Sequence, residues 1–180
     1  MSEQSRPEET TRTEANDGSK IAPRSIQGRD GKYLTFELAR EQYGLEILKV
    51  REIIGMMDIT AVPQTPAFVK GLINLRGKVI PVVDLRVKFG MKEREYTERN
   101  AIIVVEIKAE GTSVLMGIVV DNVSEVINIS GQDIENAPNF GARLKTEYIL
   151  GMAKIKGKVI ILLEIERVLT DEELTLVGRD

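Results

Sequence analysis

The chain of 180 residues contains no cysteine and no histidine. These absences exclude disulfide bonds, thiolate nucleophiles, imidazole general bases and zinc sites with the usual ligands. Every Ser-His-Asp arrangement is excluded as well, so carboxylate pairs are the only catalytic material that remains. We therefore expect a protein that is not an enzyme and that holds no metal or cofactor.

Aromatic residues and positive charge are also scarce. The chain has no tryptophan, 4% aromatic residues and a formal net charge of -3. Nucleic-acid-binding proteins normally present a basic field or aromatic stacking platforms, so this composition does not favour nucleic acid as a partner. No run approaches the roughly 20 apolar residues needed to cross a bilayer, and the N-terminus lacks the apolar segment of a signal peptide. We expect a cytoplasmic protein without direct membrane insertion.

Residues 1–28 are rich in Ser, Thr, Glu and Pro and contain few large apolar side chains. So little apolar surface cannot offset the entropy lost on ordering, which predicts a disordered N-terminal tail. The chain as a whole is 42% hydrophobic, and residues 29–180 are numerous enough to form one folded domain.

The β-branched residues are concentrated at 71–86, GLINLRGKVIPVVDLR, where an Arg-Gly-Lys turn separates two apolar runs. This pattern predicts a β-hairpin. It returns at 151–166, GMAKIKGKVIILLEIE, with the turn glycine and the flanking basic residues in matching places. The repetition indicates an internal duplication, and short strands with Gly-rich turns that appear twice predict an all-β fold of two small barrels.

Other elements are expected from local pattern. A half-buried strand at 32–38 is predicted by alternation, and 48–54 fits mostly a strand, or else a helical turn followed by a strand. Thr65 as N-cap and Pro66 at the first helical position predict a short helix over 63–71. A capping box at 170–173 predicts a C-terminal helix over 171–177. Further strands are expected at 43–47, 101–107, 113–121 and 122–127, with a charged connection at 91–99.

Two acidic residues, Asp84 and Glu164, occupy equivalent places in the two hairpins. This equivalence favours a shared structural role, such as bonding a turn amide, over catalysis. Arg76 is the first candidate for contact with a partner, because the first hairpin carries an arginine where the second carries Lys156. A solvated turn arginine is an equally good interpretation of the same position.

Five motifs in order carry a family resemblance: YGLEILKVREI at 43–53, TPAFVKG at 65–71, NLRG at 74–77, PVVDLR at 81–86 and GIVVD at 117–121. Over about residues 30–175 the chain resembles the CheW family of bacterial chemotaxis coupling proteins. The resemblance implies two SH3-like five-stranded β-barrels packed on a shared hydrophobic core, with short helices. The barrels would comprise about residues 29–90 plus C-terminal elements, and about residues 100–165.

The resemblance also implies partners and a site. The partners would be the regulatory domain of the histidine kinase CheA and the cytoplasmic tips of methyl-accepting chemotaxis receptors, joined in membrane-associated arrays. The residues that match the family's protein-binding positions are Glu52, Arg76, Val50, Gly71, Asn74, Val123 and Val126. The absence of receiver or kinase modules favours a free-standing coupler over multidomain relatives. A peptide- or oligonucleotide-binding β-barrel module unrelated to chemotaxis is the alternative, and a hydrolase using Asp84 or Glu164 is a third class.

Overall fold

The computed structural model describes residues 29–109, 111–138, 147–170 and 173. The predicted disordered tail lies outside the described residues, and so does the predicted C-terminal helix apart from Glu173. The predicted capping box is present: Thr170 Oγ1 accepts the N–H of Glu173, and the Glu173 carboxylate accepts the N–H of Thr170, each at 3.2 Å.

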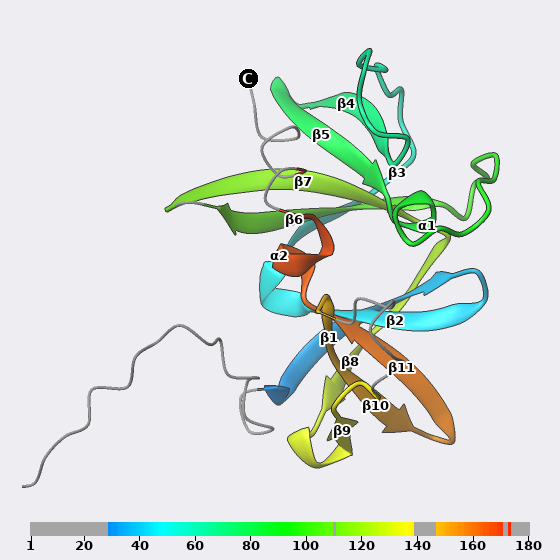
Figure 1. Ribbon diagram of the computed structural model, residues 1–180, viewed down its shortest axis with the longest axis vertical. Helices are drawn as coiled ribbons and strands as arrows, with labels where there is room; N and C mark the ends of the chain where they lie inside the picture. The colour runs from blue at the N-terminus through cyan, green and yellow to red at the C-terminus, as the bar shows by residue number, and fades with distance from the viewer. Residues whose placement is uncertain (1–28, 110, 139–146, 171–172, 174–180) are drawn as a thin grey trace, which may run out of the picture.

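The described part forms two β-sheets (Figure 1) with strand orders β8-β1-β2-β11-β10-β9 and β3-β6-β7-β5-β4. Neighbouring strands are antiparallel except for the parallel pairs β2–β11 and β5–β7. The strands are β1 Gly31–Leu38, β2 Glu41–Glu46, β3 Val50–Gly55, β4 Val69–Leu75, β5 Lys78–Asp84, β6 Ala101–Ala109, β7 Thr112–Val120, β8 Asn122–Ile129, β9 Ile134–Glu135, β10 Ile149–Ile155 and β11 Lys158–Leu163.

The helices of the described part are short. Each long hairpin ends in one turn of helix, α1 (Leu85–Lys88) after β5 and α2 (Ile165–Val168) after β11. Two 3-10 turns, η2 (Ile47–Lys49) and η3 (Gly131–Asp133), connect strands. The all-β prediction is therefore confirmed, and so are both hairpins.

Each sheet combines strands from both halves of the chain. β1 and β2 from the first half pair with β8 and β11 from the second, whereas β6 and β7 from the second half join β3 and β5 from the first. The sheets therefore do not follow the expected division of the chain near residues 90–100. One sheet has the expected five strands, and the other has six.

The hydrophobic core has three parts. The largest cluster lies between the sheets, where Figure 1 shows α2, and joins side chains from both of them, among them Phe36, Leu45, Val83, Ile103, Ile118 and Ile165. Each sheet also curls around a cluster of its own, one containing Tyr33, Leu150 and Leu162 and the other Ile73, Val82 and Val104. This arrangement confirms the shared hydrophobic core.

Two local expectations are wrong in detail. Strand β1 is buried on both faces rather than one, because it lies between the shared cluster and its own sheet's cluster. The side chains of Tyr33 and Thr35, on one face, are at most 2% exposed, and that of Phe36, on the other, is 0% exposed. Segment 48–54 is the last part of the 3-10 turn followed by a strand, which was the second interpretation of its spacing.

The predicted helix over 63–71 is absent. Thr65 Oγ1 donates back to the carbonyl of Val62 and does not cap a helix, and the N–H of Val69 bonds the carbonyl of Pro66 to close a turn. Residues from Val69 onwards then pair with β5, with a bulge between Val69 and Gly71. Tertiary pairing with β5 therefore overrides the local helix signal.

Candidate functional site

The central feature is an ion pair between Arg76 and Glu52. Glu52 lies on β3, at an edge of its sheet, and Arg76 lies in the turn between β4 and β5. Both residues were expected at a binding site, and the structure brings them into contact. The Arg76 side chain remains 70% exposed and that of Glu52 31% exposed, so the pair lies on the surface, within reach of a partner.

The turn that holds Arg76 has an unusual backbone. Arg76 and Gly77 both have positive φ, 52° and 87°, as a two-residue type I′ turn between right-twisted strands requires. Asn74 supports this turn, because its side-chain oxygen accepts the N–H of Gly77 at 2.8 Å. Asn74 therefore helps to fix the direction in which Arg76 projects.

The ion pair shifts the pKa of both partners. The hydrogen bond from Arg76, reinforced by its charge, holds the pKa of the Glu52 carboxyl below its usual value. The same bond and charge raise the pKa of Arg76. Both groups are therefore charged throughout the physiological range. Because the pair is exposed to solvent, we expect it to orient Arg76 more than it stabilises the fold.

Gly71 has a structural role that its sequence position does not reveal. Its φ is 141°, and a Cβ at this position would lie 2.0 Å from the carbonyl oxygen of Thr60. That close approach allows Thr60 and Leu72 to exchange two backbone hydrogen bonds of 2.8 Å. Gly71 is buried, so it shapes the base of the Arg76 hairpin and exposes no side chain.

The three expected valines are placed differently from one another. Val50 is half-buried at the start of β3 and packs against the shared core. Val123, on β8 of the other sheet, is also half-buried and packs against the shared core. Val126, on the same strand, is 49% exposed. The structure therefore groups Glu52, Arg76 and Asn74 at one hairpin and places Val123 and Val126 on an edge strand of the other sheet.

A polar network that the sequence analysis missed lies at the other end of β5. Asp84 accepts the N–H groups of Arg86 and Val87, which confirms its predicted role, and also the hydroxyl of Tyr96 at 2.8 Å. Glu164 makes no such cap in the second hairpin, so the predicted equivalence of the two carboxylates is wrong there. Burial, and then the bond to Asp84, raises the pKa of Tyr96.

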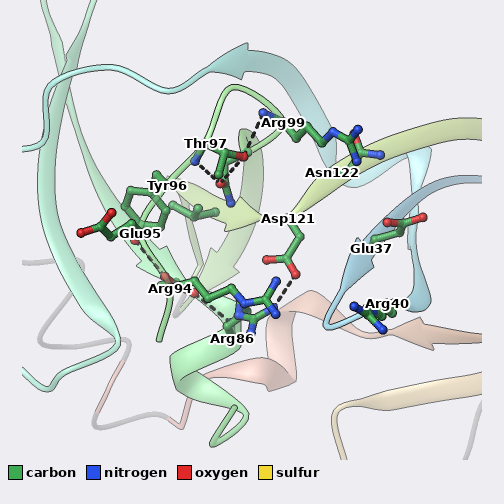
Figure 2. Close-up of a pocket in the computed structure, with 13 residues that line it drawn as sticks. Glu37, Arg40, Arg86, Arg94, Glu95, Tyr96, Thr97, Arg99, Asp121 and Asn122 are labelled. Carbon is green, nitrogen blue, oxygen red and sulfur yellow. Dashed lines mark hydrogen bonds and ion pairs between the residues drawn. The ribbon is translucent and has the colours of Figure 1, made fainter. Parts of the chain in front are cut away.

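Arg86 is the buried centre of this network. Its guanidinium donates to Asp121 at 2.5 Å (Figure 2). It also donates twice to the carbonyl of Lys92, at 3.0 and 3.1 Å. An arginine directly after an apolar hairpin, followed by a single tyrosine in a charged loop, was the available sequence signal. The network fixes loop 91–100 against the end of β5 and borders a cavity of about 310 Å³.

Among the residues that the structure describes, no group of three or more acidic side chains is placed to hold a metal ion. No helix in the same residues has the length and apolar character needed to cross a membrane.

Comparisons with known proteins agree with this description. The family model for the CheW-like domain matches residues 32–173. The chemotaxis protein CheW of Klebsiella aerogenes is 40% identical over 159 residues, which cover 88% of this chain and 92% of that protein. The chemotaxis protein CheW of Rhizobium meliloti is 36% identical over 140 residues, covering 78% and 88% respectively.

A solved structure agrees as well. The scaffolding protein TtCheW from Thermoanaerobacter tengcongensis superposes with a TM-score of 0.70 at 39% identity, covering 80% of this chain and 97% of that one. The expectation of a non-enzymatic scaffold is confirmed by these relatives. The chain therefore belongs to the CheW-like domain family of chemotaxis scaffold proteins.

Proposed function

We propose that this chain couples chemoreceptors to the histidine kinase CheA, and that the hairpin carrying Arg76 contacts the receptor. The observation that carries the proposal is the exposed Glu52–Arg76 pair on a turn fixed by Asn74. A side chain that is already oriented loses little entropy on binding, and arginine is enriched among residues that dominate interface energies. The partners would be the cytoplasmic receptor tips and the regulatory domain of the kinase, in arrays beneath the membrane.

An apolar residue near the pair suits a helical partner. Val79 on β5, opposite Asn74, is 64% exposed. A receptor helix with an apolar stripe and an acidic residue would match this combination of aliphatic surface and guanidinium. The exposed Val126 on β8 lies in the other sheet, so it belongs to a separate contact, which we assign to the kinase.

The test is binding of a receptor-tip fragment and of CheA to purified variants. Arg76→Ala should leave the melting temperature almost unchanged and weaken receptor binding about thirtyfold, with a smaller effect on kinase binding. Lys156→Ala is the matched control, because Lys156 occupies the equivalent turn with φ 51°. Glu52→Ala should weaken receptor binding less than Arg76→Ala does, because it frees the guanidinium without removing it.

Two results would count against the proposal. Normal receptor binding by Arg76→Ala would show that the residue is idle, and early unfolding of that variant would show that it is structural. An equal loss in Lys156→Ala would show that both hairpins respond to lost positive charge in general.

A further inference from the structure

The cavity beside Arg86 is separate from the Arg76 hairpin and has no role in the proposed function. It lies between the β1–β2 turn, loop 91–100 and the junction of β7 with β8. Figure 2 shows Arg86 facing Asp121, with Arg40 near them at the β1–β2 turn and Arg99 extending from the loop to a position beside Asn122. Arg94 also lines it.

Three of these arginines have unused donors. Within the residues that the structure describes, the side chains of Arg40, Arg94 and Arg99 make no hydrogen bond or ion pair. Every other arginine side chain in the same residues is bonded: Arg29 to Asn136, Arg51 to Glu106, Arg76 to Glu52, Arg86 to Asp121 and Arg167 to Glu164. In the part of the chain that the structure describes, the arginines with free guanidinium groups are thus all gathered around one cavity.

The acidic residues of the cavity are largely occupied. Asp121 accepts from Arg86 and from the N–H of Ala39, Asp84 accepts from two N–H groups and Tyr96, and Glu37 accepts from Gln42 at 3.0 Å. Glu95 is the remaining carboxylate, and Figure 2 shows it pointing away from Asp121. The lining therefore has spare donors and few spare acceptors, and a ligand that accepts hydrogen bonds would complete it.

The rim is held in place before any ligand arrives. Arg40 has φ 69°, a strained conformation for a residue with a side chain, and it is kept here by the bond from the N–H of Ala39 to Asp121 at 2.8 Å. Loop 91–100 is fixed by the bonds of Arg86 and Tyr96 and by Asn100, whose side chain donates to the carbonyl of Val120 at 3.0 Å. Such preorganisation reduces the entropy lost on binding.

We propose that this cavity is a second docking site, which accepts a carboxylate side chain from an acidic segment of a partner protein. Arg40 and Arg99 hold the carboxylate in planar, charge-assisted hydrogen bonds, and Arg94 contributes positive charge. A singly charged carboxylate fits better than a phosphate dianion, because Glu37 and Glu95 also line the cavity and repel the additional negative charge.

The test uses a fluorescein-labelled hexaglutamate peptide as probe, with hexaglutamine as the neutral control, at low salt. The protein has a net charge of -3, so general electrostatics disfavour binding of this peptide. We expect hexaglutamate alone to bind, Arg40→Ala/Arg99→Ala to bind it at least tenfold more weakly, and amide shifts to cluster at residues 39–40 and 94–100. The control Arg51→Ala/Lys108→Ala removes the same charge from exposed positions elsewhere and should bind as the wild type does.

Several outcomes would overturn the proposal. One is that hexaglutamate does not bind the wild type, and another is that both double variants bind it equally weakly. A third is that the amide shifts fall at the Arg76 hairpin, which would assign the acidic ligand to the proposed receptor surface. Displacement of the probe by inorganic phosphate at lower concentration than by free glutamate would overturn the assignment to a carboxylate. Melting temperatures of both variants check folding, and the exposed positions of Arg40 and Arg99 predict no loss.

Discussion

Replacement of Gly71 by alanine tests whether this residue acts through the fold or through partner contact. The added Cβ would lie 2.0 Å from the carbonyl oxygen and 2.6 Å from the carbonyl carbon of Thr60, which are backbone atoms that no rotamer change can move. The φ of 141° is also unfavourable for alanine. The segment around Thr60 must therefore shift away from β4.

The magnitude follows from three contributions. Backbone strain at a position that favours glycine is about 1–3 kcal/mol, and steric overpacking adds about 1–3 kcal/mol. The two hydrogen bonds between Thr60 and Leu72 contribute about 1 kcal/mol each when they are lost. Because relaxation that relieves the clash also breaks the bonds, these effects overlap, and we expect a loss of about 4 kcal/mol. For a protein of this size that lowers the melting temperature by about 10 °C.

Two other glycines provide controls, measured by thermal and urea unfolding. Gly77 has φ 87° and open space around it, so Gly77→Ala introduces strain alone, about 1–2 kcal/mol. Gly151, the counterpart of Gly71 in the second hairpin, does not have a positive φ, and a Cβ added there would lie 2.5 Å from a side-chain methyl of Ile134 and 3.1 Å from the carbonyl oxygen of Glu135. Gly71→Ala should be the least stable of the three. If Gly71→Ala unfolds no earlier than Gly77→Ala, the reasoning is wrong. If it does unfold earlier, weak receptor binding by a Gly71 variant can result from the damaged fold, so it is no evidence that Gly71 contacts the receptor.

Three further predictions concern single groups. In a carbon-13 NMR titration the lowered pKa of Glu52 should return towards its ordinary value of about 4.3 in Arg76→Ala. Because the pKa of Glu52 is lower in the folded state, the ion pair stabilises the fold above the pKa that Glu52 has in the unfolded chain, and this contribution is lost as pH falls through the folded-state pKa. The stabilities of the wild type and of Arg76→Ala should therefore converge in acid. A Glu52 carboxyl whose pKa does not differ between the two proteins would contradict the ion pair. Tyr96→Phe leaves an oxygen of Asp84 without its donor and should lower stability by about 1–2 kcal/mol. The raised pKa of Tyr96 stabilises the fold below about pH 10, and this contribution is lost at higher pH. A Tyr96 that titrates normally in ultraviolet absorbance would therefore refute the part-buried bond to Asp84. Deletion of residues 1–28 should change the melting temperature by less than about 5 °C, and a larger fall would show that the tail is docked.

The hairpins were predictable because their signals are local. The turn in 71–86 and its repeat in 151–166 need positive φ at fixed positions between apolar runs, and both strands of each hairpin are adjacent in sequence. The pairing of β8 with β1, and of β6 with β3, joins strands from different halves of the chain and was not predictable in this way. Alternation shows which face of a strand is buried, but it does not show which distant strand will pair with it.

The candidate site was predictable in part for the same reason. Arg76 was identified because the two hairpins differ there, and Glu52, which was named through the family resemblance, is found paired with it. The cavity at Arg86 was missed because it is assembled from the β1–β2 turn, loop 91–100 and Asp121, which are distant in sequence. Its members look like ordinary surface charges until the fold brings them together.

The duplication also separates the effect of a turn from the effect of its side chain. Arg76 and Lys156 have nearly the same φ, 52° and 51°, in hairpins of matching register. Arg76 forms an ion pair with Glu52. Glu125 has the matching place in the second half, because Val123-Ser-Glu-Val126 repeats the pattern of Val50-Arg-Glu-Ile53, and its backbone exchanges hydrogen bonds with the hydroxyl of Thr35 instead. Since the turn geometry is shared, any difference in binding between Arg76→Ala and Lys156→Ala must come from the side chains and their neighbours. The strain of a positive φ is common to both positions and therefore cannot explain a requirement for Arg76 alone.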